Sequence, residues 1–165
     1  MKKIINIIYI FIFFITTNIV FSAKPISYHK DWTLFQTKLD EKDICYIAAL
    51  PIKKEGTYKK RGEPYLLVMR EKNSEYDEVG VSSGFIYHKD KGIELSVLKR
   101  KFPLFPDNEK AWTYDRNDDV EIVKFMKLGA KLYVTGYSKN NYMAMDTYSL
   151  IGFNEAYTKM ITLCE

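Results

Sequence analysis

The sequence predicts a mainly β protein, a β-sandwich of short strands with two added short helices at about residues 117–128 and 153–164. Runs of β-branched and aromatic residues recur along the chain and alternate with turn sequences roughly every ten residues, which is typical of a sandwich. The hydrophobic period changes to that of a helix in the two named segments. In the second segment the apolar residues form one stripe that ends in Cys164.

The first 22 residues predict a secretory signal peptide. Lys2 and Lys3 precede an almost unbroken apolar run, and small residues flank the bond between Ser22 and Ala23. The alternative is an uncleaved anchor, because residues 4–21 are almost long enough to span a bilayer. Polar residues interrupt that run and favour cleavage. We therefore expect residues 23–165 to form a single mature domain without a stable membrane span.

The charge of the mature chain argues against nucleic acid as a partner. The full sequence has 25 Lys and Arg against 21 Asp and Glu, a net charge of +4. Two of these lysines, Lys2 and Lys3, lie in the predicted signal. The remaining surface is close to neutral, whereas domains that bind nucleic acid are usually strongly basic.

The first elements of the mature chain are predicted to be a hairpin and a loop. A β-rich run at 31–37 and an apolar run at 44–50 flank the polar turn at 40–43. Residues 51–64 hold prolines, glycines and many charges, so we expect an exposed loop. The very hydrophobic run at 65–70 then predicts a central strand.

The middle of the chain predicts further short strands. Alternation at 78–85 predicts a strand with one face toward water. Three more short strands are expected between residues 93 and 114, with Pro103 and Pro106 breaking them.

The predicted helix at 117–128 has start and stop signals. Asn117 and Asp118 are candidate N-caps, Asp119 belongs to the helix start, and Gly129 follows the last turn. The residues expected to face inward are Val120, Val123, Met126 and Leu128. A hairpin is expected next, and Gly152 then permits the sharp passage into the final helix.

The two cysteines, Cys45 and Cys164, predict one disulfide that fastens the final helix to the early hairpin. A translocated protein with two cysteines most simply pairs them. Cys45 lies in an apolar run without a basic neighbour that would lower its pKa, so a catalytic thiol is not expected.

No residue set predicts catalysis, a metal site or a cofactor. His29 lies near the mature N-terminus and His88 in a polar turn, and both are expected to be solvated. The serine pair before Gly84 lacks the pattern of a nucleophile elbow. The acidic turn at 75–78 lacks the full spacing of calcium ligands.

One loop stands out as a candidate site for an anionic partner, such as a phosphorylated glycan, lipid headgroups or an acidic protein surface. It carries five cations and an aromatic residue: Lys53, Lys54, Tyr58, Lys59, Lys60 and Arg61. Clustered cations attract anions in a salt-dependent way. The alternatives are a merely soluble loop and, for Arg61 with Glu63, a structural role in closing the loop.

Several runs of the mature chain carry a resemblance to a known family. They are Asp31-Trp32, Cys45-Tyr46-Ile47-Ala48, Arg61-Gly62-Glu63-Pro64-Tyr65, Asp77-Glu78-Val79, Ala111-Trp112 and the segment from Asp146 to Tyr157. Their order and spacing resemble the invasion-associated locus B family of exported bacterial proteins. The resemblance implies an immunoglobulin-like β-sandwich with helices added, and an address in the periplasm or at the cell surface. It also implies, for some members, a part in entry into host cells, and no known reaction.

The sequence thus favours an exported, non-enzymatic binding protein of the envelope of a Gram-negative bacterium, in the periplasm or at the outer surface. Its partner would be an unidentified protein, a glycan or an anionic envelope surface, and support of host-cell contact or invasion would be one role. A periplasmic envelope-maintenance protein without a host partner is the second expectation. An envelope hydrolase is the third.

Overall fold

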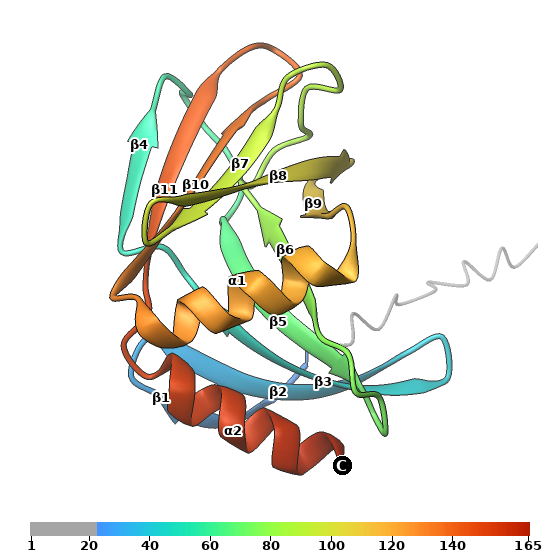
Figure 1. The fold of residues 1–165 in the computed structure, drawn as a ribbon. Helices are drawn as coiled ribbons and strands as arrows, with labels where there is room; N and C mark the ends of the chain where they lie inside the picture. The colour runs from blue at the N-terminus through green and yellow to red at the C-terminus, as the bar shows by residue number, and fades with distance from the viewer. Residues whose placement is uncertain (1–22) are drawn as a thin grey trace, which may run out of the picture.

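The computed structural model describes residues 23–165, so the predicted signal peptide lies outside the described residues. The described chain contains eleven strands and two helices (Figure 1). In chain order they are β1 (Pro25–His29), β2 (Trp32–Leu39), β3 (Lys42–Ala49), β4 (Lys53–Gly56), β5 (Tyr65–Glu71), β6 (Glu78–Ser82), β7 (Ile93–Val97), β8 (Arg100–Asp107), β9 (Lys110–Thr113), α1 (Arg116–Leu128), β10 (Lys131–Tyr137), β11 (Met143–Ser149) and α2 (Phe153–Cys164).

The strands form one antiparallel sheet in the order β1-β2-β3-β5-β6-β9-β8-β7-β10-β11-β4. The sheet curls over, because β2 and β11, near opposite ends of this order, meet: Trp32 Nε1 donates to the carbonyl oxygen of Ser149 at 3.0 Å. The inner face encloses the apolar core, and helix α1 packs against β6, β7 and β9. The predicted mainly β, sandwich-like fold with two helices is confirmed.

Helix α2 covers β2 and β3 with its apolar stripe (Figure 1). Phe153 meets the buried Trp32 edge to face, with ring centroids 5.0 Å apart. At the far end of the helix, Cys164 forms a disulfide with Cys45 of β3, across a Cα–Cα distance of 5.9 Å. The passage into the helix requires Gly152, whose φ is +90° and whose added Cβ would lie 2.0 Å from the carbonyl oxygen of His29.

Helix α1 begins one residue earlier than predicted, at Arg116, and its buried face agrees only in part with the prediction. Its N-cap is Asp115, whose side chain accepts from the backbone N–H groups of Asn117 and Asp118, so neither of those residues is the cap. Val120 is 64% exposed rather than inward-facing. Leu128 is exposed as well, whereas Val123 and Met126 are buried as predicted, together with Asp119 and Ile122.

Two strand predictions need correction. β6 does not present a face to water, because its residues 79–82 are all buried and Trp112 of β9 packs directly on Gly80. β8 runs unbroken through Pro103 and Pro106. It pairs with β7 only as far as Leu104 and with β9 only from Leu104 onward, so each proline lies where the strand has a single partner. A proline without an N–H group is tolerated there.

The predicted loop at 51–64 contains a strand that the sequence did not predict. β4 pairs along β11 and forms one edge of the sheet. At the opposite edge lies β1, which the sequence also did not predict as a strand. Both edge strands are short, and β4 is almost entirely charged.

Asp119 is a buried carboxylate with an unusual environment. Its Oδ1 accepts from the backbone N–H of Val79 and from the hydroxyl of Thr113, both at 2.8 Å. Burial raises the pKa of Asp119 to about 6, although these two hydrogen bonds oppose the rise, and the nearby charges of Glu78 and Asp77 add to it.

This raised pKa predicts a loss of stability as the pH rises. The folded protein holds the proton of Asp119 more tightly than the unfolded chain does. As the pH rises from about 4 to about 6, ionisation of Asp119 therefore lowers the free energy of unfolding by on the order of 2 kcal/mol. Asp119→Asn keeps an accepting oxygen but cannot titrate. We expect its unfolding free energy, measured in urea, to rise relative to wild type across that interval, and parallel pH profiles would contradict this.

Candidate functional site

The cations of the predicted binding loop fall into two groups in the structure. Lys53 lies 2.8 Å from Glu55, and Lys54 pairs with Glu63. Arg61, expected at the surface, is only 3% exposed at its side chain and is paired as well. Within the described chain, Lys59 and Lys60 have no carboxylate at ion-pair distance. The cluster of five free cations is therefore reduced to two.

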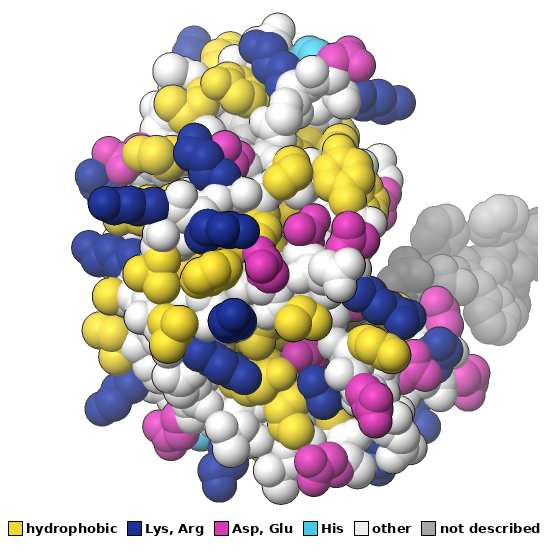
Figure 2. Space-filling model, viewed as in Figure 1, with side chains coloured by type: hydrophobic (Ala, Val, Ile, Leu, Met, Phe, Trp, Pro, Cys, Tyr) yellow, Lys and Arg dark blue, Asp and Glu magenta, His cyan; other side chains and the backbone are white. Residues whose placement is uncertain are grey.

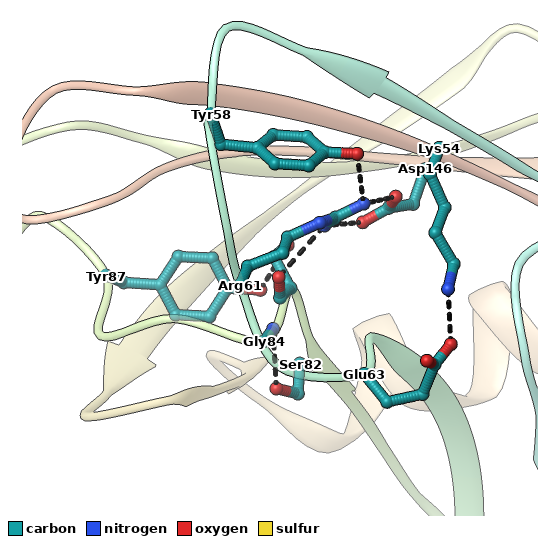
Figure 3. A network of polar contacts seen from close by, with 9 residues as sticks. Lys54, Tyr58, Arg61, Glu63, Ser82, Gly84, Tyr87 and Asp146 are labelled. Carbon is teal, nitrogen blue, oxygen red and sulfur yellow. Dashed lines mark hydrogen bonds and ion pairs between the residues drawn. The ribbon is translucent and has the colours of Figure 1, made fainter.

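Arg61 is the anchor of the loop (Figure 3). Its guanidinium makes two parallel contacts with Asp146 of β11, one of them Nη1 to Oδ2 at 2.6 Å, and the Asp146 side chain is 0% exposed. Nη1 also donates to the carbonyl oxygen of Ser83, and Nη2 to the hydroxyl of Tyr58, whose ring lies 4.1 Å from the guanidinium. Burial opposes the charge, yet the hydrogen bonds and charge of Asp146 outweigh it and raise the pKa of Arg61.

The loop is also held from the other side. The backbone N–H of Gly62 donates to the carbonyl oxygen of Gly84 at 2.7 Å. Next to this contact the hydroxyl of Tyr87 donates to Ser83 Oγ, and burial raises the pKa of Tyr87 to about 12. Arg61 and Glu63 thus each close the loop, but with Asp146 and Lys54 rather than with one another. The loop is fixed in place, and its two free lysines are presented on a rigid support.

Lys59 and Lys60 border a shallow pocket of about 430 Å³, which we call the loop surface. Its lining residues come from four loops: Tyr58, Lys59, Lys60, Phe85, Ile86, Glu109, Ser138, Lys139, Asn140 and Tyr142. Three cations face one carboxylate there. Figure 2 shows basic side chains beside hydrophobic ones at the end of the molecule where β10 turns into β11. Such a surface can hold an anion by charge and pack against its apolar part.

Sequence reasoning missed Lys139 as a member of this surface. The residue lies in the turn between β10 and β11, and its backbone N–H donates to the carbonyl oxygen of Ile86 at 2.9 Å. Ser138 closes the same turn by two bonds with Tyr142. A lysine in a polar turn carries no sequence signal for binding; only the pairing of distant loops brings it beside Lys59 and Lys60.

Of the two histidines, His29 lies between a serine hydroxyl and a carboxylate, whereas His88 lies in a polar turn. His29 is buried, against expectation: Nδ1 lies 3.1 Å from Glu155 Oε1, and Nε2 hydrogen-bonds with Ser27 Oγ at 2.8 Å. His88 is half-buried in its turn and accepts from the backbone N–H of Asp90. In the described part of the chain, no three His, Cys, Asp or Glu side chains are grouped to hold a metal ion. No helix among residues 23–165 is long and apolar enough to cross a bilayer.

Comparison with known proteins supports the fold. No protein-family model and no curated protein matches the sequence. Among solved structures, the chain is similar to the crystal structure of invasion associated protein B from Bartonella henselae, with a TM-score of 0.57 and 14% sequence identity. The match covers 83% of this chain and 95% of that one. The resemblance seen in the sequence therefore has support at the level of the fold.

Proposed function

We propose that this protein is an exported, non-enzymatic binding protein of the bacterial envelope, related to the invasion-associated locus B family, and that its loop surface holds an anionic partner. The sequence runs and the fold similarity support the relationship. The disulfide between Cys45 and Cys164 supports export, since such bonds persist outside the cytosol. Phosphate groups on lipids or glycans are the anions that envelope surfaces present most densely.

The observation that carries this proposal is that the cations of the loop have different roles. Arg61 forms a buried ion pair with Asp146. Lys59, Lys60 and Lys139 lie beside Tyr58 and form no ion pair within the described residues. Because the Arg61 anchor holds the backbone in place, little ordering cost remains when an anion binds. Long-range attraction and a pre-arranged set of donors favour a binding role for the loop surface.

The test is a charge-removal variant with a matched control. Lys59→Gln, Lys60→Gln and Lys139→Gln together should weaken binding to phosphatidylglycerol vesicles or to a phosphorylated oligosaccharide by at least about tenfold, since each lysine near an anionic surface contributes roughly 1 kcal/mol. The control removes three exposed lysines elsewhere, Lys124, Lys131 and Lys159. Co-sedimentation and calorimetry measure both.

Three outcomes would contradict the proposed function: unchanged binding by the Lys59, Lys60 and Lys139 variant, an equal loss in the control, or equal binding of the wild type to neutral phosphatidylcholine vesicles. Binding should also weaken as salt is raised to about 0.15 M or more. Protease accessibility on intact cells then separates a role in host-cell contact, which needs an exposed protein, from envelope maintenance inside the periplasm.

A further inference from the structure

A second hollow lies between the N-terminal end of α1 and strands β3, β5 and β9, and it shares no lining residue with the loop surface. This cleft has a volume of about 640 Å³. Its lining includes the apolar side chains of Met69, Phe105 and Trp112. Trp112 lies flat on β6, because an added Cβ on Gly80 would come within 2.4 Å of its ring. Trp112 also lines the cleft, and Lys110 Nζ lies 6.0 Å from the centroid of its ring.

The cleft already holds a cation against an aromatic wall. The guanidinium of Arg116 lies 4.0 Å from the ring centroid of Tyr76, and both residues line the cleft. Phe105 and Tyr76 are also exposed. Aromatic faces attract guanidinium and ammonium groups by their ring electrons, most strongly where water is partly excluded. The wall therefore has the chemistry to accept a second cationic group.

Carboxylates dominate the charge of the cleft. Six of them line it against two cations, Lys42 and Arg116. Lys42 neutralises Glu71, and Arg70 neutralises Asp77. The six carboxylates belong to Asp40, Glu71, Asp77, Glu78, Asp115 and Asp119.

Four of these carboxylates lack a cation of their own, and one of the four, Asp115, accepts instead from the backbone N–H groups that begin α1. Asp40 and Glu78 have no basic partner at ion-pair distance within residues 23–165, and both are exposed at the rim. Asp119 is 4% exposed, and the described hydrogen bonds all go to its Oδ1, which leaves Oδ2 without a donor. Oδ2 is therefore an acceptor that an N–H group of a partner could use.

We propose that this cleft binds a cationic segment of a partner polypeptide, with arginine or lysine side chains set against the aromatic wall and the free carboxylates. Arginine fits best, because its planar group can stack on Tyr76 or Trp112 while it donates to Asp40 or Glu78. The charge of the cleft excludes the anionic ligand assigned to the loop surface. The proposal therefore goes beyond the proposed function, and each can fail without the other.

Two tryptophans provide a local probe of this binding. Trp112 lines the cleft, whereas Trp32 is fully buried and bonded to Ser149. In a titration followed by two-dimensional ¹⁵N–¹H NMR, a peptide of alternating arginine and alanine should shift the indole signal of Trp112 and leave that of Trp32 in place. A peptide of the same length with glutamate in place of arginine should shift neither.

Removal of the rim charges completes the test. Asp40→Asn with Glu78→Gln should weaken binding of the arginine peptide about fivefold, because two partly exposed ion pairs are lost. A control with the same charge change, Asp31→Asn with Asp90→Asn, lies outside both the cleft and the loop surface and should bind as wild type does.

Unchanged affinity in the Asp40 and Glu78 variant, an equal loss in the Asp31 and Asp90 control, or a shift of both indole signals would overturn the proposal. Binding of the glutamate peptide at the Trp112 signal would overturn it as well. Both variants alter only exposed side chains, so a change in fold is not expected, and the unmoved Trp32 signal verifies this in the same spectra.

Discussion

Asp146→Asn is expected to lower the free energy of unfolding by about 3 to 5 kcal/mol, since it leaves the guanidinium of Arg61 buried without its counter-charge. The Asp146 side chain is fully buried and that of Arg61 nearly so. Arg61 Nε has no acceptor among the described residues, and the remaining partners, Ser83 and Tyr58, are neutral. Urea unfolding followed by tryptophan fluorescence measures the loss.

A second variant separates the buried charge from the shape of the site. Replacing both partners by apolar residues, Arg61→Met with Asp146→Leu, removes the unpaired charge and should recover most of the lost stability. Glu121→Gln breaks an exposed pair with Arg100 instead and should cost less than about 1 kcal/mol. If Asp146→Asn cost no more than Glu121→Gln, the buried pair would not be the anchor of the loop.

The anchor also explains why sequence reasoning placed Arg61 at the surface. Arg61 and Asp146 are 85 positions apart, and the two lysines before Arg61 are exposed. Nothing local distinguishes an arginine that ends a basic cluster from one that turns inward to a distant strand. The alternative of structural closure could be weighed from Gly62 and Glu63, but the partner could not be named, because it depends on how β11 is placed against the loop.

The parts of the fold that the sequence predicts well are those with a strong local pattern. The hairpin of β2 and β3, the central strand β5 and helix α2 have long apolar runs or stripes of a single period. β4 has no such pattern: it is four residues, Lys53–Gly56, and is a strand only because β11 offers an edge to pair with. β8 likewise remains a strand through Pro103 and Pro106 because of its pairing with β7 and β9, which its local sequence does not reveal.

The candidate sites were harder to predict than the fold, because each is assembled from loops that meet only in three dimensions. The sequence predicted Lys59 and Lys60 as binding residues but not Lys139. In the cleft, Asp119 was read only as a residue of the helix start, yet α1 turns it inward to β6. Each candidate site has a buried charged residue beside it, Arg61 at the loop surface and Asp119 in the cleft. Such burial follows from tertiary packing and cannot be seen in the local sequence.

Loss of the disulfide should have the other large effect. Cys45 and Cys164 are 119 positions apart, and closing a loop of that size restricts the unfolded chain by roughly 4 to 5 kcal/mol in the chain-entropy model. We expect the reduced protein, or Cys45→Ala with Cys164→Ala, to unfold in urea with a free energy lower by about 3 to 5 kcal/mol. The two alanines keep the buried site apolar, so most of the loss reflects the missing bond.

Hydrogen exchange would show where the loss is felt. Helix α2 keeps its first-turn contact between Phe153 and Trp32, and Tyr157 donates to Asp77 Oδ2 at 2.6 Å. Amides in the last two turns should therefore exchange faster than those near Phe153 when the bond is absent. Tyr157→Phe, which removes one hydrogen bond and keeps the disulfide, should cost only about 1 kcal/mol and serves as the control. Equal urea midpoints for oxidised and reduced protein would mean that packing alone holds α2 on β3.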